Sequence, residues 1–170
     1  MPVADSSSTF FQPKTQLDLG SLGKGWALDR AVVCLREVGI SAAFLHGGTS
    51  SAWGLGHPPD ADAWRVEIAN VPDSFMDPTS PAPIRERVDL REASLSVSAT
   101  WGRELKEPNG RSFGHVFDPR TGEPIPGLRR AAVLGPSAAD TDALSTALLV
   151  AGTRLASSWQ TDHPGLRFWL

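Results

Sequence analysis

The most strongly patterned part of the sequence is LDLGSLGKGWALDRAVVCLREVGISAAFLHGG, residues 17–48. Its glycine-rich start follows a short apolar segment, residues 16–19, which we expect to form a strand. Apolar residues then recur at helical spacing over residues 26–38, and Gly39 suits a left-handed helix end. Residues 40–45 are apolar and predict a second strand. The stretch therefore predicts a βαβ-type unit, with a glycine loop between its first strand and its helix.

The remainder of the chain indicates a sheet followed by a long helix. We expect strands over residues 64–69, within 88–97, over 112–117, 128–134 and 166–170, a surface loop over 72–83, and a helix that opens at 137–142 and continues to 159. The fold class is therefore α+β (mixed α/β), with a sheet of several strands covered by at least two helices. We expect residues 1–15 to be an irregular tail and residues 16–170 to form one domain, since 170 residues are one domain's worth of chain.

Composition restricts the classes of partner. The formal net charge of −3 gives no basic field, so nucleic acid is not expected to bind. A single cysteine excludes an internal disulfide and a multi-cysteine zinc site, and Cys34, inside VVCL, is expected to be a buried structural thiol. No apolar stretch is long enough to span a bilayer, and the N-terminus shows no signal-peptide pattern or lipoprotein leader.

The glycine loop DLGSLGKG, residues 18–25, is compatible with binding of an anion. A glycine-rich turn before a helix presents backbone N–H groups and the positive end of the helix dipole, and Lys24 adds a charged donor. The spacing matches neither G-x-x-x-x-G-K-[ST], which needs a hydroxyl in place of Gly25, nor G-x-G-x-x-G. The residues alone leave both a phosphate cradle and a plain strand-to-helix turn open.

The predicted C-terminal helix carries a candidate metal site. Asp142 and Thr146 are four residues apart, so they share one helix face, and Ser145 lies beside them. A carboxylate and a hydroxyl are hard oxygen ligands that suit Mg²⁺ or Ca²⁺, with carbonyls, water or ligand phosphates completing the shell. The alternative is that Asp142 and its neighbours only cap the helix start.

Two further motifs allow chemistry as well as a structural role. His115, in a predicted strand, could carry a proton near neutral pH or make an ordinary hydrogen bond. Asp118 and Arg120 are expected to organise the following turn through a local ion pair. Gly47 and Gly48 permit close approach of the backbone to a ligand, or a plain turn.

Five ordered blocks resemble the ApbE-type FAD:protein FMN transferase family, from about residue 16 to the end of the chain. They are LDLGSLGKGWALDR, FLHGGTSSAWG, SVSATWG, GHVFDPRTGEPI and ADTDALSTALLVAG. The resemblance implies a T-fold-related architecture and Mg²⁺-dependent transfer of FMN from FAD to a Thr or Ser hydroxyl of a target protein, with release of AMP. It also implies a location in the bacterial cell envelope.

The resemblance also implies roles for individual residues. Those matching the family's metal-binding positions are Asp142 and Thr146, with Ser145 beside them, and the backbone carbonyl of Gly23. Those matching positions near FAD are Gly20, Lys24, Trp26, Gly47, Gly48 and Phe117. His115 matches the histidine implicated in the transfer step.

The chain departs from the family pattern in three places. Thr49 replaces the usual aspartate, Ser98 begins a segment where TSG is common, and only about fifteen residues precede the glycine loop. The family's N-terminal region is thus expected to be missing, leaving an incomplete sheet that a second copy or another chain would cover. Two alternative functions remain open: a non-catalytic flavin-binding module, and metal-dependent hydrolysis of FAD to FMN and AMP.

Overall fold

A computed structural model describes residues 12, 14–69, 84–102, 104–106, 112–127 and 129–170. Its main sheet has five antiparallel strands in the order β1-β2-β5-β8-β9. These strands are β1 (Ala43–His46), β2 (Ser51–Leu55), β5 (Ala93–Ala99), β8 (Arg130–Gly135) and β9 (Arg167–Trp169). Two antiparallel pairs accompany it, β3 (Trp64–Ala69) with β4 (Ile84–Leu90) and β6 (Glu104–Lys106) with β7 (Ser112–Gly114). The helices are α1 (Gly23–Glu37), α2 (Ala138–Ala151) and α3 (Thr153–Asp162).

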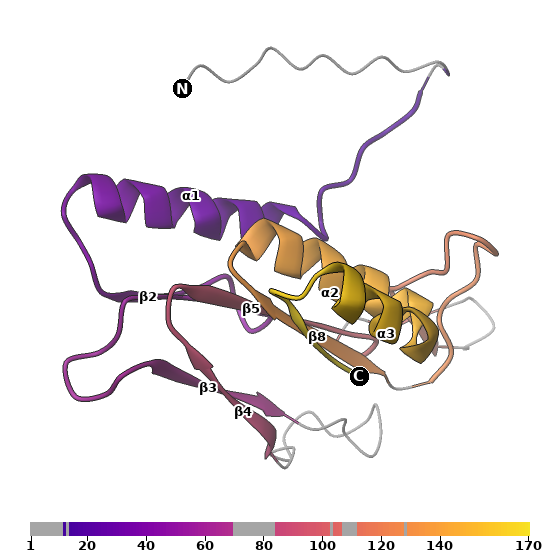
Figure 1. Ribbon diagram of the computed structural model, residues 1–170. Coiled ribbons are helices and arrows are strands. Elements are labelled where there is room, and N and C mark those ends of the chain that lie inside the picture. Colours follow the sequence, from indigo (N-terminus) through magenta and orange to yellow (C-terminus); the bar gives the residue numbers. More distant parts are fainter. Residues whose placement is uncertain (1–11, 13, 70–83, 103, 107–111, 128) are drawn as a thin grey trace.

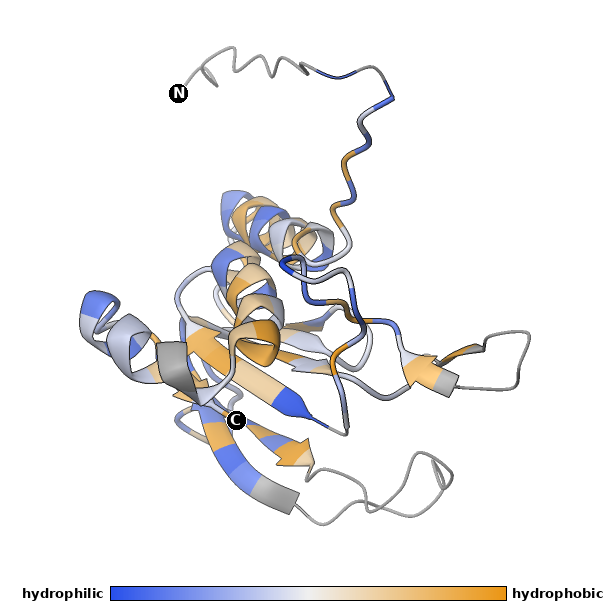
Figure 2. Ribbon diagram, turned by 90° about the vertical axis from the view of Figure 1, so that its right-hand side faces the viewer, coloured by the Kyte–Doolittle hydropathy of each residue, from blue (hydrophilic) through white to orange (hydrophobic). Residues whose placement is uncertain are grey.

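The elements form three layers. The helices lie on one face of the main sheet, and the β3–β4 hairpin lies on the other (Figure 1). Apolar residues line the central strands, whereas hydrophilic and apolar residues are interspersed along the helices (Figure 2). Three apolar clusters hold the layers together, around Leu90 under the sheet, Trp53 beneath α1 and Leu148 beneath α2. The α+β class and the coverage of the sheet by at least two helices are confirmed.

The two long helices cross at very close range. Gly25, in the first turn of α1, lies so near α2 that a Cβ atom there would stand 2.0 Å from the Ala138 carbonyl oxygen. A side chain at this position would therefore force the helices apart. The contact brings the start of α1 against the start of α2, and this crossing forms one wall of the site described below.

The prediction of a βαβ unit is wrong, because its first strand does not form. Residues 15–19 form no strand, and Leu17 and Leu19 are 70% and 60% exposed. The glycine loop is also shorter than expected, because α1 begins at Gly23, which donates its N–H to the Leu19 carbonyl at 2.7 Å. The segment fails as a strand because no neighbouring strand pairs with it: β1 lies at the sheet edge and pairs antiparallel with β2.

Three other sequence expectations need correction. Cys34 is exposed, because α1 turns Leu28 and Val32 toward the sheet and places residue 34 on another face. The C-terminal helix is two helices, which Gly152 separates with φ of +70°. Strand β7 ends at Gly114, so His115 follows the strand rather than lying within it.

Other predicted elements are confirmed with small shifts of their ends. Strands occur at β3, β4, β5, β8 and β9, and α1 stops at Glu37 before Gly39, whose φ is +81°. The predicted loop over 72–83 and residues 1–11 and 13 of the predicted tail lie outside the described residues. No helix in the described part of the chain is both long and apolar enough to cross a bilayer.

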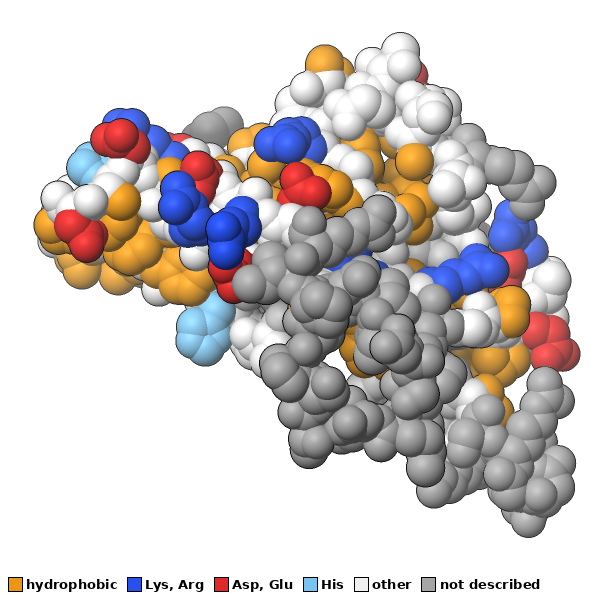
Figure 3. Space-filling view, turned by 90° about the horizontal axis from the view of Figure 1, so that it is seen from below, with side chains coloured by type: hydrophobic (Ala, Val, Ile, Leu, Met, Phe, Trp, Pro, Cys, Tyr) orange, Lys and Arg blue, Asp and Glu red, His pale blue; other side chains and the backbone are white. Residues whose placement is uncertain are grey.

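The outer face of the β3–β4 hairpin carries charges of both signs. Two cross-strand ion pairs run along it, Arg65 with Asp89 at 3.1 Å and Arg87 with Glu67 at 3.0 Å. Seen from below, Lys and Arg side chains accordingly lie beside Asp and Glu (Figure 3). All four side chains are largely exposed, so each pair contributes little to stability.

Candidate functional site

An open pocket of about 1080 Å³ brings together most of the residues that the sequence singled out. The predicted site residues that line it are Gly20, Lys24, His115, Phe117, Asp142 and Thr146. They come from the loop before α1, the first turn of α1, the segment after β7, and α2, and strand β5 contributes Ser98. Segments far apart in the sequence therefore converge on one cavity large enough for a nucleotide-sized ligand.

Asp142 is the most constrained of these side chains. Its carboxylate is buried, with the residue 3% exposed, and it has polar partners on both α1 and β2. The Gly25 N–H donates to Oδ2 at 3.0 Å, the Lys24 ammonium lies 3.3 Å from Oδ1, and the Ser51 hydroxyl donates to Oδ1 at 3.5 Å. A buried carboxylate requires such partners, because an isolated buried charge is very unfavourable.

Asp142 is not a helix cap. Ser137 caps α2, and its hydroxyl accepts the Asp140 N–H at 3.2 Å. Asp142 lies deeper, in the second turn. The capping alternative for Asp142 is therefore wrong, whereas the shared face with Thr146 holds, since both side chains border the pocket.

Asp29 of α1 completes the cap of α2 from outside the helix. Its carboxylate accepts the N–H groups of Ala138 and Ala139 at 2.8 and 3.0 Å and the Ser137 hydroxyl at 3.1 Å. It also accepts the indole N–H of Trp53 at 3.1 Å. One carboxylate thus joins α1, β2 and the start of α2, and a negative charge is favourable at a helix N-terminus. We call this arrangement the Asp29 cap.

Thr146 and Ser145 both contact Ser98, but only Thr146 borders the pocket. The Thr146 hydroxyl borders the pocket and pairs with the Ser98 hydroxyl at 2.9 Å. Ser145 is fully buried, pairs with Ser98 at 2.8 Å, and donates to the Asp142 carbonyl at 3.0 Å. Thr146 is thus placed to contact a ligand, whereas Ser145 supports the turn from behind.

A chain of buried hydroxyl groups runs from Asp142 between β5 and α2. Ser96 donates to Ser51 at 3.2 Å, Thr141 donates to Ser96 at 3.3 Å, and Ser94 pairs with Thr141 at 3.0 Å. All four residues are at most 4% exposed. We call this chain the hydroxyl row. Its members fill the space between helix and sheet with mutually satisfied polar groups.

The opposite side of the pocket is formed by the segment after β7. His115 is half-buried and Phe117 is 41% exposed, and the Phe117 ring meets Phe113 edge-on with centroids 6.0 Å apart. The turn that follows is held as expected by an ion pair between Asp118 and Arg120 at 2.6 Å. Hydrogen bonds from the Arg120 side chain and backbone lower the pKa of Asp118 to about 2.

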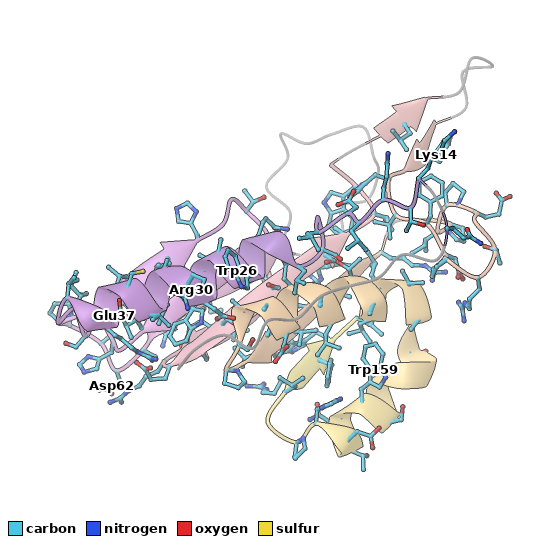
Figure 4. All side chains as sticks on the ribbon, turned by 90° about the horizontal axis from the view of Figure 1, so that it is seen from above. Lys14, Trp26, Arg30, Glu37, Asp62 and Trp159 are labelled. Atoms are coloured by element: carbon cyan, nitrogen blue, oxygen red, sulfur yellow. The ribbon has the colours of Figure 1, made fainter. Side chains whose placement is uncertain are left out.

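Besides the buried Ser145, four predicted site residues do not border the pocket. Trp26 is 60% exposed and lies with Arg30 and Glu37 along the outer face of α1 (Figure 4). Gly23 is the first residue of α1. Gly47 packs beside the Lys24 side chain, where an added Cβ would lie 3.5 Å from the Lys24 Cβ, and Gly48 is exposed with φ of +72°.

The sequence reasoning missed several residues that shape the site. Asp29 and Ser51 act across long sequence separations, and no local pattern marks them. Ser98 was detectable, because serines at 94, 96 and 98 alternate along β5 and must face one side of the sheet. Arg130, which is buried and donates to the Ala69 carbonyl, also lines the pocket.

The donor set suits a hard divalent cation only in part. Asp142 and Thr146 offer a carboxylate and a hydroxyl oxygen at the pocket wall, a pair that fits Mg²⁺. Within the described residues, no group of three or more His, Cys, Asp or Glu side chains gathers. Ligand oxygens would therefore have to complete the coordination, as they do in sites that share Mg²⁺ with a phosphate.

The fold and this pocket define a class: α+β proteins in which a lysine and hard oxygen donors meet at a helix crossing beside a nucleotide-sized cavity. Within that class, the chain belongs to the ApbE family, whose model matches residues 3–170. A similar protein, the FAD:protein FMN transferase of Salmonella typhimurium, is 30% identical over 146 residues, covering 85% of this chain and 39% of that protein. The corresponding protein of Rhodobacter capsulatus is 37% identical over 143 residues, covering 82% and 25%.

Solved structures agree on the fold. The apo flavinyl transferase ApbE of Pseudomonas stutzeri superposes with a TM-score of 0.69 at 25% identity, covering 90% of this chain and 45% of that one. The ApbE protein of Thermotoga maritima gives 0.72 at 24% identity, covering 90% and 47%. The chain thus spans less than half the length of these relatives, and the resemblance to ApbE architecture is confirmed.

Proposed function

We propose that this protein transfers the FMN part of FAD to a Thr or Ser hydroxyl of a target protein, in a Mg²⁺-dependent reaction that releases AMP. One observation carries the proposal: Asp142 and Thr146, on one face of α2, border the same pocket as Lys24 and His115. The relatives are FAD:protein FMN transferases, which supports the choice of reaction.

The start of α1 and the loop before it are suited to hold the diphosphate of FAD. Gly20 and Lys24 border the pocket at the N-terminal end of α1, where the helix dipole favours an anion. Phe117, on the opposite side, offers an exposed aromatic face for stacking with a flat ring. The binding groups therefore lie where a ligand with a charged centre and an aromatic end requires them.

The Asp142 carboxylate and the Thr146 hydroxyl would hold the metal. When bound, Mg²⁺ neutralises charge on the phosphates and makes the attacked phosphorus more electrophilic. The hydroxyl row and the Gly25 N–H keep Asp142 in place, so this carboxylate does not have to move when the cation binds.

The transfer step would use His115 as a proton acceptor. The acceptor hydroxyl oxygen forms a bond to the FMN phosphorus, while the bond from that phosphorus to the bridging oxygen breaks. AMP leaves with the electron pair of the broken bond, and the hydroxyl proton passes to the His115 ring nitrogen. The half-buried position of His115 at the pocket wall allows access for a protein substrate.

Thermal unfolding and mass spectrometry test this proposal. FAD with Mg²⁺ should raise the midpoint of unfolding of the wild-type chain, and an acceptor peptide should gain the mass of FMN. Asp142→Asn should abolish the Mg²⁺-dependent part of the shift. Absence of both the shift and the mass gain in the wild type would refute the proposal.

Two intermediate results would redirect the assignment. Binding of FAD without transfer, at saturating Mg²⁺ and acceptor, would indicate a flavin-binding module, a function that the short coverage of the relatives also allows. Release of AMP without an acceptor would indicate hydrolysis of FAD to FMN and AMP.

A further inference from the structure

The ammonium of Lys24 lies beside Asp142, the carboxylate that would hold the metal ion. Its Nζ lies 3.3 Å from Asp142 Oδ1, and the same Nζ donates to the Gly20 carbonyl at 3.3 Å. The Asp142 side chain is 5% exposed and the Lys24 side chain 41%. The buried carboxylate is thus neutralised by a cation whose flexible side chain extends to the pocket surface.

A divalent cation and this ammonium compete for one carboxylate oxygen. Oδ1 already receives the Lys24 ammonium and the Ser51 hydroxyl, and Oδ2 is used by the Gly25 N–H. A metal ion bound at Oδ1 would meet a like charge at close range in a partly buried site, where repulsion is weakly screened. Metal binding therefore requires Lys24 to leave.

A diphosphate gives Lys24 another anion to bind. Both Lys24 and Gly20 border the pocket at the start of α1, so rotation of the lysine side chain can carry its ammonium to a phosphate oxygen without moving the helix. The movement removes the like charge from Asp142, and the same phosphate oxygens complete the metal's coordination.

We propose that Lys24 is the resident counter-ion of Asp142 and that a diphosphate ester draws it away, so that metal and nucleotide bind with positive coupling. The inference rests on the proposed function in taking FAD as the ligand, and it adds that neither metal nor FAD alone binds as tightly as both together. By linkage, each ligand raises the affinity for the other by the same factor.

Metal binding by the full chain tests this directly, with Mn²⁺ as the probe and electron paramagnetic resonance of the free ion as the readout. Without nucleotide, Lys24→Met and Lys24→Gln should each bind Mn²⁺ about tenfold more tightly than the wild type, within the usual range of coupling between sites. Arg30→Met is the matched control, because it removes one positive charge from the exposed outer face of the same helix (Figure 4). It should leave Mn²⁺ affinity unchanged.

A second titration follows FAD by flavin fluorescence, first in a chelator and then with Mn²⁺. Both Lys24 variants should bind FAD more weakly than the wild type in the chelator. The factor by which FAD tightens Mn²⁺ binding should also shrink in both, but not in Arg30→Met. Asp142→Asn should lose Mn²⁺ binding, which assigns the signal to this carboxylate.

The outcomes separate this inference from the function on which it rests. If the wild type binds both FAD and Mn²⁺ but the two Lys24 variants bind Mn²⁺ no more tightly, the counter-ion role is overturned and the proposed function stands. If the wild type binds neither ligand, both proposals fail. Using two variants guards against a folding defect in one of them, and circular dichroism of each checks the fold.

Discussion

Replacement of Asp29 by alanine should destabilise the protein far more than its half-buried position suggests. The Asp29 cap accepts two backbone N–H groups and one hydroxyl from the start of α2, as well as the Trp53 indole N–H, at 2.8–3.1 Å. Loss of a helix cap costs about 1–2 kcal/mol. Leaving the indole N–H of buried Trp53 without its acceptor adds about 1–2 kcal/mol. We therefore expect Asp29→Ala to lower the free energy of unfolding by about 3 kcal/mol.

Urea denaturation and thermal unfolding measure this loss. For a chain of this size, about 3 kcal/mol corresponds to a fall of about 6–12 °C in the unfolding midpoint. Asp62→Ala, at an exposed position far from the helix crossing (Figure 4), is the control and should change stability by less than about 0.5 kcal/mol. Hydrogen exchange locates the effect, since the Ala138 and Ala139 amides should exchange faster in Asp29→Ala.

A loss below about 1 kcal/mol, with the denaturant slope unchanged, would show that Asp29 does not hold the start of α2 as described. So would a full loss of stability without faster exchange at the first turn of α2, because the defect would then lie elsewhere. Asp29→Asn separates charge from shape: it keeps one acceptor oxygen, so its loss should be smaller than that of Asp29→Ala.

Three further predictions concern other parts of the molecule. Gly25→Ala should lower the free energy of unfolding, measured in urea, by more than about 3 kcal/mol, because its Cβ would overlap the Ala138 carbonyl. Gly165→Ala is the control and should be tolerated, since a Cβ there meets open space. Equal effects of the two substitutions would contradict the close crossing. Arg120→Gln should raise the pKa of Asp118 from about 2 toward its ordinary value of 3.8, measurable by NMR titration. Since the folded-state pKa is the depressed one, the wild type's stability advantage over Arg120→Gln should be full near neutral pH and vanish as the pH falls from 3.8 to about 2; an advantage that persists in acid would be inconsistent with it. Cys34 should react with a thiol reagent in the folded protein as fast as in urea, and protection by folding would restore the buried assignment.

The sequence predicted most elements whose pattern is local. Strand β3 follows strict alternation, and α1 follows helical spacing, so a pattern within each segment indicates its structure. The prediction of a strand over residues 16–19 was wrong because a strand also needs a partner strand, and the sequence of one segment does not show whether a partner is present. Cys34 failed because neighbouring valines hid which face of α1 is buried.

The candidate site likewise contains residues that local spacing predicts and residues that it does not. The i, i+4 spacing of Asp142 and Thr146 placed both at the pocket, because that relation is local to one helix. The donors that hold Asp142 come from 117 and 91 residues away, in Gly25 and Ser51, and no spacing rule joins them. His115 and Lys24 border the same cavity. The family resemblance implied that they belong to one site, whereas periodicity did not.

The hydroxyl row has a consequence for the temperature dependence of stability. Exposure of apolar surface raises the heat capacity of the unfolded chain, whereas exposure of polar surface lowers it. Between α2 and β5 the chain buries Ser94, Ser96 and Thr141 where an aliphatic layer is usual. This hydroxyl contact with β5 therefore contributes little to the curvature of the stability profile, unlike the aliphatic contact of Leu148 and Leu149 with β8. It should weaken less on cooling than the contact of α1 with Trp53 and Leu55.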